Sequence, residues 1–279
     1  MRTLAYGESN KWARRIRMKR YLGLVAVQVR ASLLLLTRYR ADFFINAVMA
    51  LFWTATAVIP LLVLYADRAT VAGWTWPQAL LVVGLFTSLK GVLNGAIQPA
   101  LQAVVEHVRK GTLDFILLKP ADAQFLISTS GLELWMGSDV VGGLALIGYG
   151  LHKGNITPGL SGWSLCMLQV LCAIVILYSI WIMVVSLAFH FVKVDNLSFL
   201  FASIFDAARW PASVFHGVFA WLFTFVMPLA LMTTYPALAL LGRSSVMNVL
   251  GSLFSALVFA VLSRIVWRAS IYHYTGAGG

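Results

Sequence analysis

The sequence predicts an all-α, polytopic integral membrane protein with six transmembrane helices. Of its 279 residues, 60% are hydrophobic and only 11% are charged, and the mean hydropathy is +0.84. Soluble domains carry roughly 25% charged residues, and several apolar runs here reach the roughly 20 residues that cross a bilayer core. We therefore expect one helical membrane domain over residues 43–279, preceded by a basic segment over residues 1–42.

The basic segment is the first element. Ten of the 21 Lys and Arg residues lie in residues 1–40, and apolar residues recur among them at helical spacing over residues 12–36. This pattern predicts an amphipathic helix in the membrane interface, resting on anionic lipid head groups. A plain cytosolic extension is the alternative. Because the basic patch adjoins a membrane span and no soluble domain is expected, we predict no binding to nucleic acid.

The next elements are two apolar runs separated by a short polar loop. The first span is expected from about Phe43 to Tyr65, and the second from about Pro77 to Gln98. Tryptophans in the loop between them suit the opposite head-group layer. A charged segment over residues 99–125 then returns the chain to the basic side, and a third span is expected from about Leu126 to Gly150.

Two long apolar runs later in the chain predict further spans. The fourth span, from about Trp163 to Val192, is longer than a bilayer needs and suits a tilted or protruding helix. The last runs from about Val246 to Val266. With a fifth span between them, six crossings leave both termini in the cytoplasm. Sixteen Lys and Arg residues then lie on the cytoplasmic side and three outside, which is a strong positive-inside bias.

The stretch between these two spans has two interpretations. One has a short fifth span from Leu197 to about Ala208, followed by a re-entrant hairpin on the outer side within residues 209–242. The other puts residues 197–216 at the cytoplasmic interface and the fifth span at about Val218 to Leu240. Proline-broken backbone at membrane depth is tolerated only where protein or a water cavity covers it. The residues that would shape a re-entrant element are Arg209, Pro211, Pro228 and Pro236.

We expect no catalytic, cofactor-binding or metal site in this chain. The five histidines fall in separate segments. The two cysteines, Cys166 and Cys172, lie in one apolar run at a spacing that suits neither zinc nor thioredoxin-type chemistry. No phosphate-binding loop of the form Gly-x-x-x-x-Gly-Lys-Ser/Thr occurs. If the protein uses ATP, another subunit must hydrolyse it.

Three charges fall within the expected spans, where they are costly and often functional. Lys90 and Glu133 lie at matching depths in the second and third spans, so an ion pair between these helices is our hypothesis. Asp139 lies nearer the outer side. The alternative is that Lys90 snorkels and Glu133 reaches cytosolic water.

The same two spans contain several glycines, which have no side chain. They are Gly91 and Gly95 in the second span, and Gly142, Gly143 and Gly148 in the third. Small residues let helix backbones approach, so close packing of these helices is expected, with a dimer face as the alternative.

The charged segment carries the most specific pattern in the chain. Residues 111–120 read Gly-Thr-Leu-Asp-Phe-Ile-Leu-Leu-Lys-Pro, which matches Gly-x-Leu-Asp-x-x-Leu-x-Lys-Pro. In this pattern the chain resembles a bacterial subgroup of the permease subunits of type-two ABC exporters. Further stretches similar to that subgroup, in the same order, are residues 39–43, 209–211, 214–215, 235–237 and 272–274.

The resemblance implies a half-transporter in the bacterial cytoplasmic (inner) membrane. It would pair with a second permease, identical or related, and with two cytosolic ABC ATPase subunits that bind ATP and magnesium. The charged segment would be the coupling helix, seated in a groove of the ATPase, and the proline-broken stretch would be the re-entrant element near the outer face. The residues implied in coupling are Glu106, His107, Arg109, Lys110, Gly111, Leu113, Asp114, Lys119 and Pro120.

The function expected is that of an exporter subunit, which couples ATP hydrolysis in a partner to outward movement of a hydrophobic or amphipathic substrate. A membrane scaffold or assembly protein without transport is the alternative, and the charged segment would then be an ordinary cytosolic loop. A secondary transporter ranks lower, because no inverted repeat is visible and Glu133 and Asp139 are its only candidate mid-depth acids.

Overall fold

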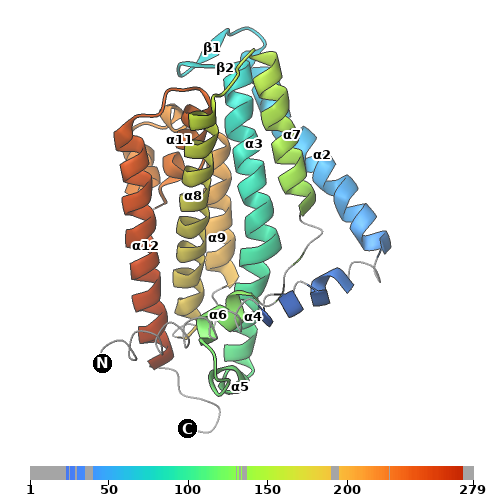
Figure 1. Cartoon of the computed structure of the whole chain (residues 1–279), viewed down its shortest axis with the longest axis vertical. Coiled ribbons are helices and arrows are strands. Elements are labelled where there is room, and N and C mark those ends of the chain that lie inside the picture. The colour runs from blue at the N-terminus through green and yellow to red at the C-terminus, as the bar shows by residue number, and fades with distance from the viewer. Residues whose placement is uncertain are drawn as a thin grey trace, which may run out of the picture.

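The structure is a computed structural model that describes most of the chain. The described residues are 23–24, 26–28, 30–34, 40–129, 131, 133, 137–189, 195–225 and 227–272. Those between 23 and 34 are helical, and the rest of the predicted amphipathic helix lies outside the described residues. Helices make up most of the described part (Figure 1), so the all-α prediction is confirmed.

Within the described part, four helices are long and apolar enough to cross a membrane. They are α2 (Arg40–Tyr65), the continuous helix Trp76–Arg109, α8 (Leu160–Ser186) and α12 (Val246–Tyr272). The prediction of a polytopic membrane fold is thereby supported. The total of six crossings and the cytoplasmic termini remain predictions.

A small β-hairpin joins the first two of these helices. Its strands, β1 (Thr70–Val71) and β2 (Trp74–Thr75), pair antiparallel over both of their residues. The two residues between them, Ala72 and Gly73, have φ of 49° and 83°. Positive φ at both positions matches the right-handed twist of the strands, so a two-residue turn closes the hairpin.

The second long helix extends beyond its predicted end at Gln98. α3 (Trp76–Val92) runs through a π-helical turn (Leu93–Ile97) into α4 (Gln98–Arg109). Together they form one helix of 34 residues. Residues 99–109 of the charged segment are therefore a direct continuation of a membrane span.

Pro99 does not end this helix, because its neighbours compensate for it. Proline lacks an N–H, and its ring crowds the carbonyl four residues earlier, which here belongs to Gly95. The π-helical turn before Pro99 has a wider backbone, which makes room for the proline ring. The Gly95 carbonyl instead accepts the backbone N–H of Glu133 at 2.7 Å.

The third predicted span begins later than its expected start at Leu126. α6 (Ala123–Ser128) is a separate short helix, and α7 begins only at Gly137 and runs to Lys153. The Asp122 carboxylate caps α6 by accepting a backbone N–H from its first turn at 3.1 Å. Gly131 then adopts φ of 80°, which suits glycine and interrupts the helix. The cap thus fixes the start of α6, and the glycine turn separates α6 from α7, which hydropathy alone had merged into one span.

Glycines bring the backbones of α3 and α7 into contact. A methyl group added at Gly84 would come within 2.7 Å of the Gly143 carbonyl oxygen, and one at Gly91 within 2.9 Å of the Val140 nitrogen. The close packing predicted for Gly91 and Gly143 is confirmed. Gly148, by contrast, has no described residue near the position of its absent side chain.

α8 forms the centre of the bundle. It packs along α12 and, near the hairpin end, against α11 (Tyr235–Leu240). Its residues Ile176, Ile180 and Trp181 are almost fully buried. The helix starts slightly before the predicted Trp163 and passes into a 3-10 turn over Leu187–Phe189, beyond which residues 190–194 lie outside the described part.

The segment between α8 and α12 is broken into short helices. They are α9 (Asp195–Phe205), 3-10 turns over Asp206–Arg209 and Ala212–Val214, α10 (Gly217–Phe225), a π-helical turn over Ala230–Thr234, and α11. The Ser213 hydroxyl donates to the Ala72 carbonyl and accepts the Trp74 indole N–H, at 3.1 and 3.2 Å, so this point touches the hairpin. α11 lies at the same end (Figure 1). Both interpretations of this stretch, and the re-entrant role of residues 209–242, remain predictions.

Candidate coupling surface and intramembrane cavity

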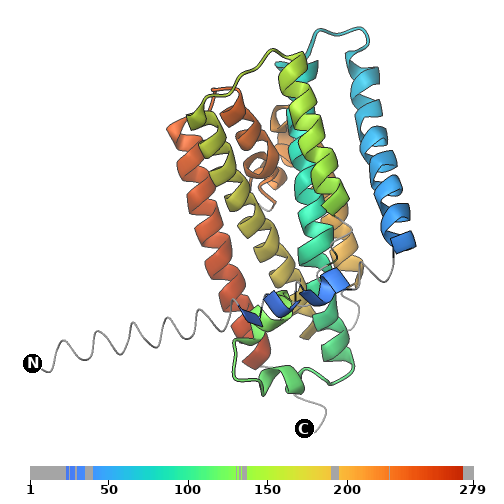
Figure 2. The same cartoon turned by 45° about the vertical axis from the view of Figure 1, so that its right-hand side comes forward.

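The residues predicted to couple lie at the end of the bundle opposite the hairpin, where Figure 2 shows short helices crossing below the long ones. α4 ends there, and α5 (Asp114–Leu117) follows after a tight turn. The first three predicted residues sit on the last turn of α4, the next three in the turn, and the rest on α5 or just after it. They therefore form one continuous helix–turn–helix.

The backbone builds the turn between α4 and α5. The Thr112 N–H donates to the His107 carbonyl at 2.9 Å, and the Gly111 N–H donates to the Val108 carbonyl at 3.2 Å. This pair of bonds ends a helix on a left-handed residue, and Gly111 has φ of 65°. Leu113 is fully buried and anchors the turn in the core.

The charges of this turn point outward. Lys110 Nζ lies 2.8 Å from one carboxylate oxygen of Glu106, and Arg109 Nη1 lies 3.6 Å from the other. All three side chains are about half exposed or more. Exposed pairs of this kind contribute little to stability, so the same charges can contact a partner at small cost.

Two apolar side chains on this surface were missed by the sequence analysis. Phe115 is 69% exposed and Leu118 is 81% exposed, and both lie beside the charged residues Asp114 and Lys119. Apolar residues next to a membrane span are expected to be buried, so the sequence contained no direct indication that these two are exposed. Their spacing of three within a charged segment was the available signal. An apolar pair rimmed by charge is typical of a protein-docking surface.

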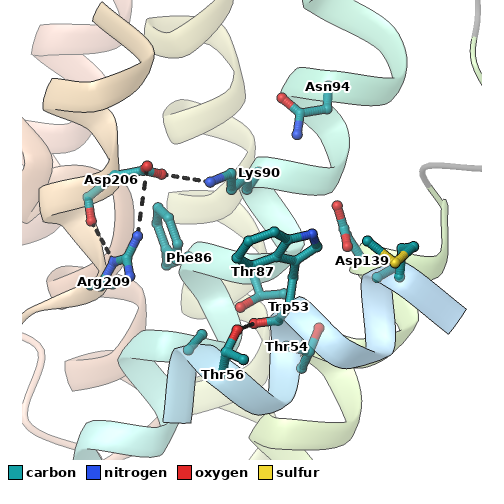
Figure 3. Close-up of a pocket in the computed structure, with 13 residues that line it drawn as sticks. Trp53, Thr54, Thr56, Phe86, Thr87, Lys90, Asn94, Asp139, Asp206 and Arg209 are labelled. Carbon is teal, nitrogen blue, oxygen red and sulfur yellow. Dashed lines mark hydrogen bonds and ion pairs between the residues drawn. The ribbon is translucent and has the colours of Figure 1, made fainter. Parts of the chain in front are cut away.

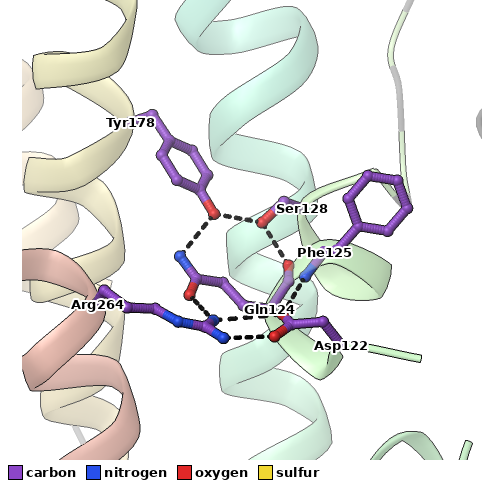
Figure 4. A network of polar contacts seen from close by, with 6 residues as sticks. All are labelled: Asp122, Gln124, Phe125, Ser128, Tyr178 and Arg264. Atoms are coloured by element: carbon purple, nitrogen blue, oxygen red, sulfur yellow. Dashed lines mark hydrogen bonds and ion pairs between the residues drawn. The ribbon is translucent and has the colours of Figure 1, made fainter. Parts of the chain in front are cut away.

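A polar network ties α6 to two of the long helices (Figure 4). The Arg264 guanidinium on α12 donates to both carboxylate oxygens of Asp122 and to the side-chain oxygen of Gln124. The Gln124 amide donates to the Tyr178 hydroxyl on α8 at 3.0 Å, and the Ser128 and Tyr178 hydroxyls are 2.6 Å apart. The segment that follows α5 is therefore fixed to α8 and α12 by side chains.

The same contact sets the ionisation of Asp122. The hydrogen bond from Arg264 lowers the pKa of the Asp122 carboxyl, against the opposing effect of its partial burial. Because the folded-state pKa lies below the unfolded one, the pair stabilises the protein fully above the unfolded pKa. That contribution is lost as the pH falls through the folded pKa.

Replacing Arg264 by methionine is expected to lower the free energy of unfolding by about 1–2 kcal/mol, because the carboxylate and the amide lose a charged donor in a half-buried place. Thermal unfolding in detergent checks this at neutral pH, and again below about pH 4, where the difference from wild type should narrow. Arg268→Met, an exposed change one turn further on α12, is the control. Equal losses in the two variants would contradict the role of the network.

The second site is a cavity of about 750 Å³ between α2, α3, α7 and the 3-10 turn after α9 (Figure 3). Lys90 Nζ lies 2.7 Å from Asp206 Oδ1, and Arg209 Nη2 lies 3.7 Å from the other carboxylate oxygen. Both cations also lie over the Phe86 ring, at 5.6 and 5.4 Å from its centre. The lining residues are Met49, Ala50, Trp53, Thr54, Thr56, Ala57, Phe86, Thr87, Lys90, Asn94, Asp139, Asp206 and Arg209.

The hypothesis of a Lys90–Glu133 pair is wrong. Glu133 lies before α7 begins and contacts Gly95 through its backbone, while Lys90 pairs with Asp206. The prediction assumed that Glu133 lies within the third span at the depth of Lys90. Because α7 begins only at Gly137, Glu133 lies outside that helix. Asp139, the third predicted charge, does line the cavity with Lys90.

The predicted re-entrant residues do not form one site. Arg209 belongs to the cavity, Pro211 separates two 3-10 turns, and Pro228 and Pro236 are buried beside the π-helical turn that leads into α11. In the described part of the chain, no group of three or more His, Cys, Asp or Glu side chains is placed to hold a metal ion.

Comparison with known proteins identifies the family. A family model described as ABC-2 family transporter protein matches residues 51–278, which is more than four fifths of the chain. The match includes the coupling surface and every residue that lines the cavity except Met49 and Ala50. No curated protein and no solved structure shows significant similarity to the chain. The chain therefore belongs to the ABC-2 family of transporter proteins and is a transmembrane component of an ABC transporter.

Proposed function

We propose that this chain is the permease subunit of an ABC exporter in the bacterial cytoplasmic membrane. It pairs with a second permease, identical or related, and with two cytosolic ATPase subunits that bind ATP and magnesium. The observation that carries the proposal is the exposed, charged helix–turn–helix at the end of the longest helix, in a chain of this family. The transported molecule is hydrophobic or amphipathic.

The coupling residues are joined to the membrane spans by rigid connections. α4 is continuous with α3, so a displacement of the turn at Gly111 moves a membrane span without an intervening loop. The segment after α5 is held to α8 and α12 through Asp122 and Arg264. Closure of an ATPase dimer against this surface would thus act on three long helices at once.

The chemistry of the surface assigns roles within it. Phe115 and Leu118 are the apolar anchors that a groove on the ATPase would bury, because buried apolar contacts at the centre of an interface carry most of its affinity. Asp114 adjoins Phe115, and Glu106 and Arg109 lie on the last turn of α4. These charges set the orientation and the salt dependence of binding. Leu113 and Gly111 act indirectly, by holding the turn.

Co-purification in detergent with a candidate ABC ATPase tests the proposal. Replacing both Phe115 and Leu118 by alanine is expected to reduce the bound ATPase at least about tenfold, which corresponds to loss of two interface anchors. A triple alanine variant at Glu106, Arg109 and Asp114 is expected to bind the ATPase more weakly than wild type does. Its binding should also depend less on the salt concentration.

The matched control is Leu160→Ala, which removes an equally exposed apolar side chain at the opposite end of the bundle. It should leave the bound ATPase unchanged. If wild-type protein retains no ATPase, or if the variants on the coupling surface bind as well as wild type, the exporter proposal fails. The chain would then be a membrane scaffold without a coupling role.

A further inference from the structure

The intramembrane cavity has a feature that ATPase coupling does not explain. Lys90 lies about 21 Å along the helix from its start at the hairpin end, at 1.5 Å per residue, and so sits well inside the bilayer region. Charges at this depth are expensive and mark pathways or binding sites. Here four charged side chains line one space.

The charges are arranged in two groups of opposite sign. Lys90 and Arg209 share the single carboxylate of Asp206, which leaves one net positive charge in that group. Asp139 lies on the other side of Lys90 in Figure 3, against Gly91 on α3. Within the described part of the chain, its carboxylate makes no hydrogen bond or ion pair. The cavity is therefore neutral overall, with its positive and negative charges separated.

This pattern selects the charge of a ligand. A net anion or a net cation would leave an uncompensated charge in a medium of low dielectric constant, which costs free energy. A ligand with separated charges of both signs would place its anion beside Lys90 and Arg209 and its cation beside Asp139. The indole of Trp53, which Figure 3 shows within the cavity, adds an aromatic face for that cation.

The wall that α2 forms indicates that the ligand also has an apolar tail. α2 contributes Met49, Ala50 and Ala57 to the cavity, yet only 11% of the apolar window of this helix is buried. Figure 2 shows α2 at the edge of the bundle. The cavity therefore lies directly behind a helix whose other face meets lipid. A volume of about 750 Å³ holds a polar head group, while a long chain would extend past α2.

We infer that this cavity binds an amphipathic molecule with a zwitterionic head group. If this ligand is the transported substrate, the inference rests on the proposed function. Binding itself does not depend on an ATPase, so the two can fail separately.

Native mass spectrometry of the full chain in an uncharged maltoside detergent measures the binding. The probes have equal acyl chains and differ in the head group: lysophosphatidylcholine is zwitterionic, lysophosphatidylglycerol is anionic, and an alkyltrimethylammonium is cationic. Glycerophosphocholine supplies the zwitterionic head group alone. Wild type is expected to bind lysophosphatidylcholine at least about fivefold more tightly than each of the other three probes.

Two variants locate the site. Asp139→Asn removes the negative group, so it is expected to bind the zwitterion about tenfold more weakly and to prefer the anionic probe. Ala50→Trp fills the cavity from α2 and is expected to reduce binding of the zwitterion by a similar factor. Leu51→Trp adds the same side chain on the exposed face of α2 and should bind like wild type.

Equal binding of the three charged or zwitterionic probes by wild type would overturn the inference, as would an Asp139→Asn variant with unchanged preference. Equal binding by the two tryptophan variants would place the ligand elsewhere, which also overturns it. If glycerophosphocholine binds as tightly as lysophosphatidylcholine, the acyl chain does not contribute and the ligand need not be amphipathic, which contradicts that part of the inference. If Ala50→Trp does not fold, the head-group preference of Asp139→Asn decides the question.

Discussion

Replacing Gly143 by alanine is expected to lower the free energy of unfolding by about 2–3 kcal/mol, because the added methyl group has no room between α3 and α7. It would lie 2.5 Å from the Gly84 carbonyl oxygen and 2.6 Å from the Ser88 backbone nitrogen. Both are backbone atoms, so no side-chain rotation relieves the overlap and the two helices must separate.

The same change at Gly148, on the same helix, is the matched control. That position has open space among the described residues, so alanine should be neutral, or stabilising by about 0.5–1 kcal/mol through its higher helix propensity. Thermal unfolding of both purified variants compares them. If Gly143→Ala unfolds at the temperature of Gly148→Ala, the backbone contact between α3 and α7 does not exist as described.

The second large effect is expected at Asp206. Changing it to asparagine removes the carboxylate that Lys90 and Arg209 share. Losing one partner of a fully buried pair costs about 3–5 kcal/mol, and these side chains are about one third exposed to the cavity. We therefore expect a loss of about 2 kcal/mol.

A double variant makes this prediction specific. Lys90→Met alone should cost less than about 1 kcal/mol, because Arg209 still pairs with Asp206. Combined with Asp206→Asn, it should recover part of the loss, since only one uncompensated cation remains. Unfolding temperatures of the two single variants, the double variant and Asp67→Asn, an exposed control beyond α2, measure the coupling. Additive effects in the double variant would show that the pair is not coupled.

Much of the fold follows from simple features of the sequence. Long apolar runs identified the four long helices, and glycines at Gly91 and Gly143 identified the closest helix contact. These features are local, or reflect the fixed thickness of a bilayer, and therefore appear in the sequence itself.

The errors came from contacts between distant residues. The partner of Lys90 is 116 positions away at Asp206, and depth along a span cannot distinguish it from other acids at a similar level. The helix runs past the predicted end of the second span at Gln98, and the bond that compensates for Pro99, from Glu133 to Gly95, comes from another segment. At the candidate coupling surface, Phe115 was missed because only the folded structure shows that nothing described covers it.

The helix from Trp76 to Arg109 has a mechanical consequence. Its 34 residues span about 51 Å, which exceeds the roughly 30 Å hydrocarbon core by about 20 Å. A tilt of this helix as one body would pivot about a point inside the bilayer. Because a stiff rod of this length magnifies small tilts, a rotation of about 5° shifts one end relative to the other by about 4 Å. A push on the charged turn would thus move the β-hairpin at the other end by part of this distance, in the opposite direction.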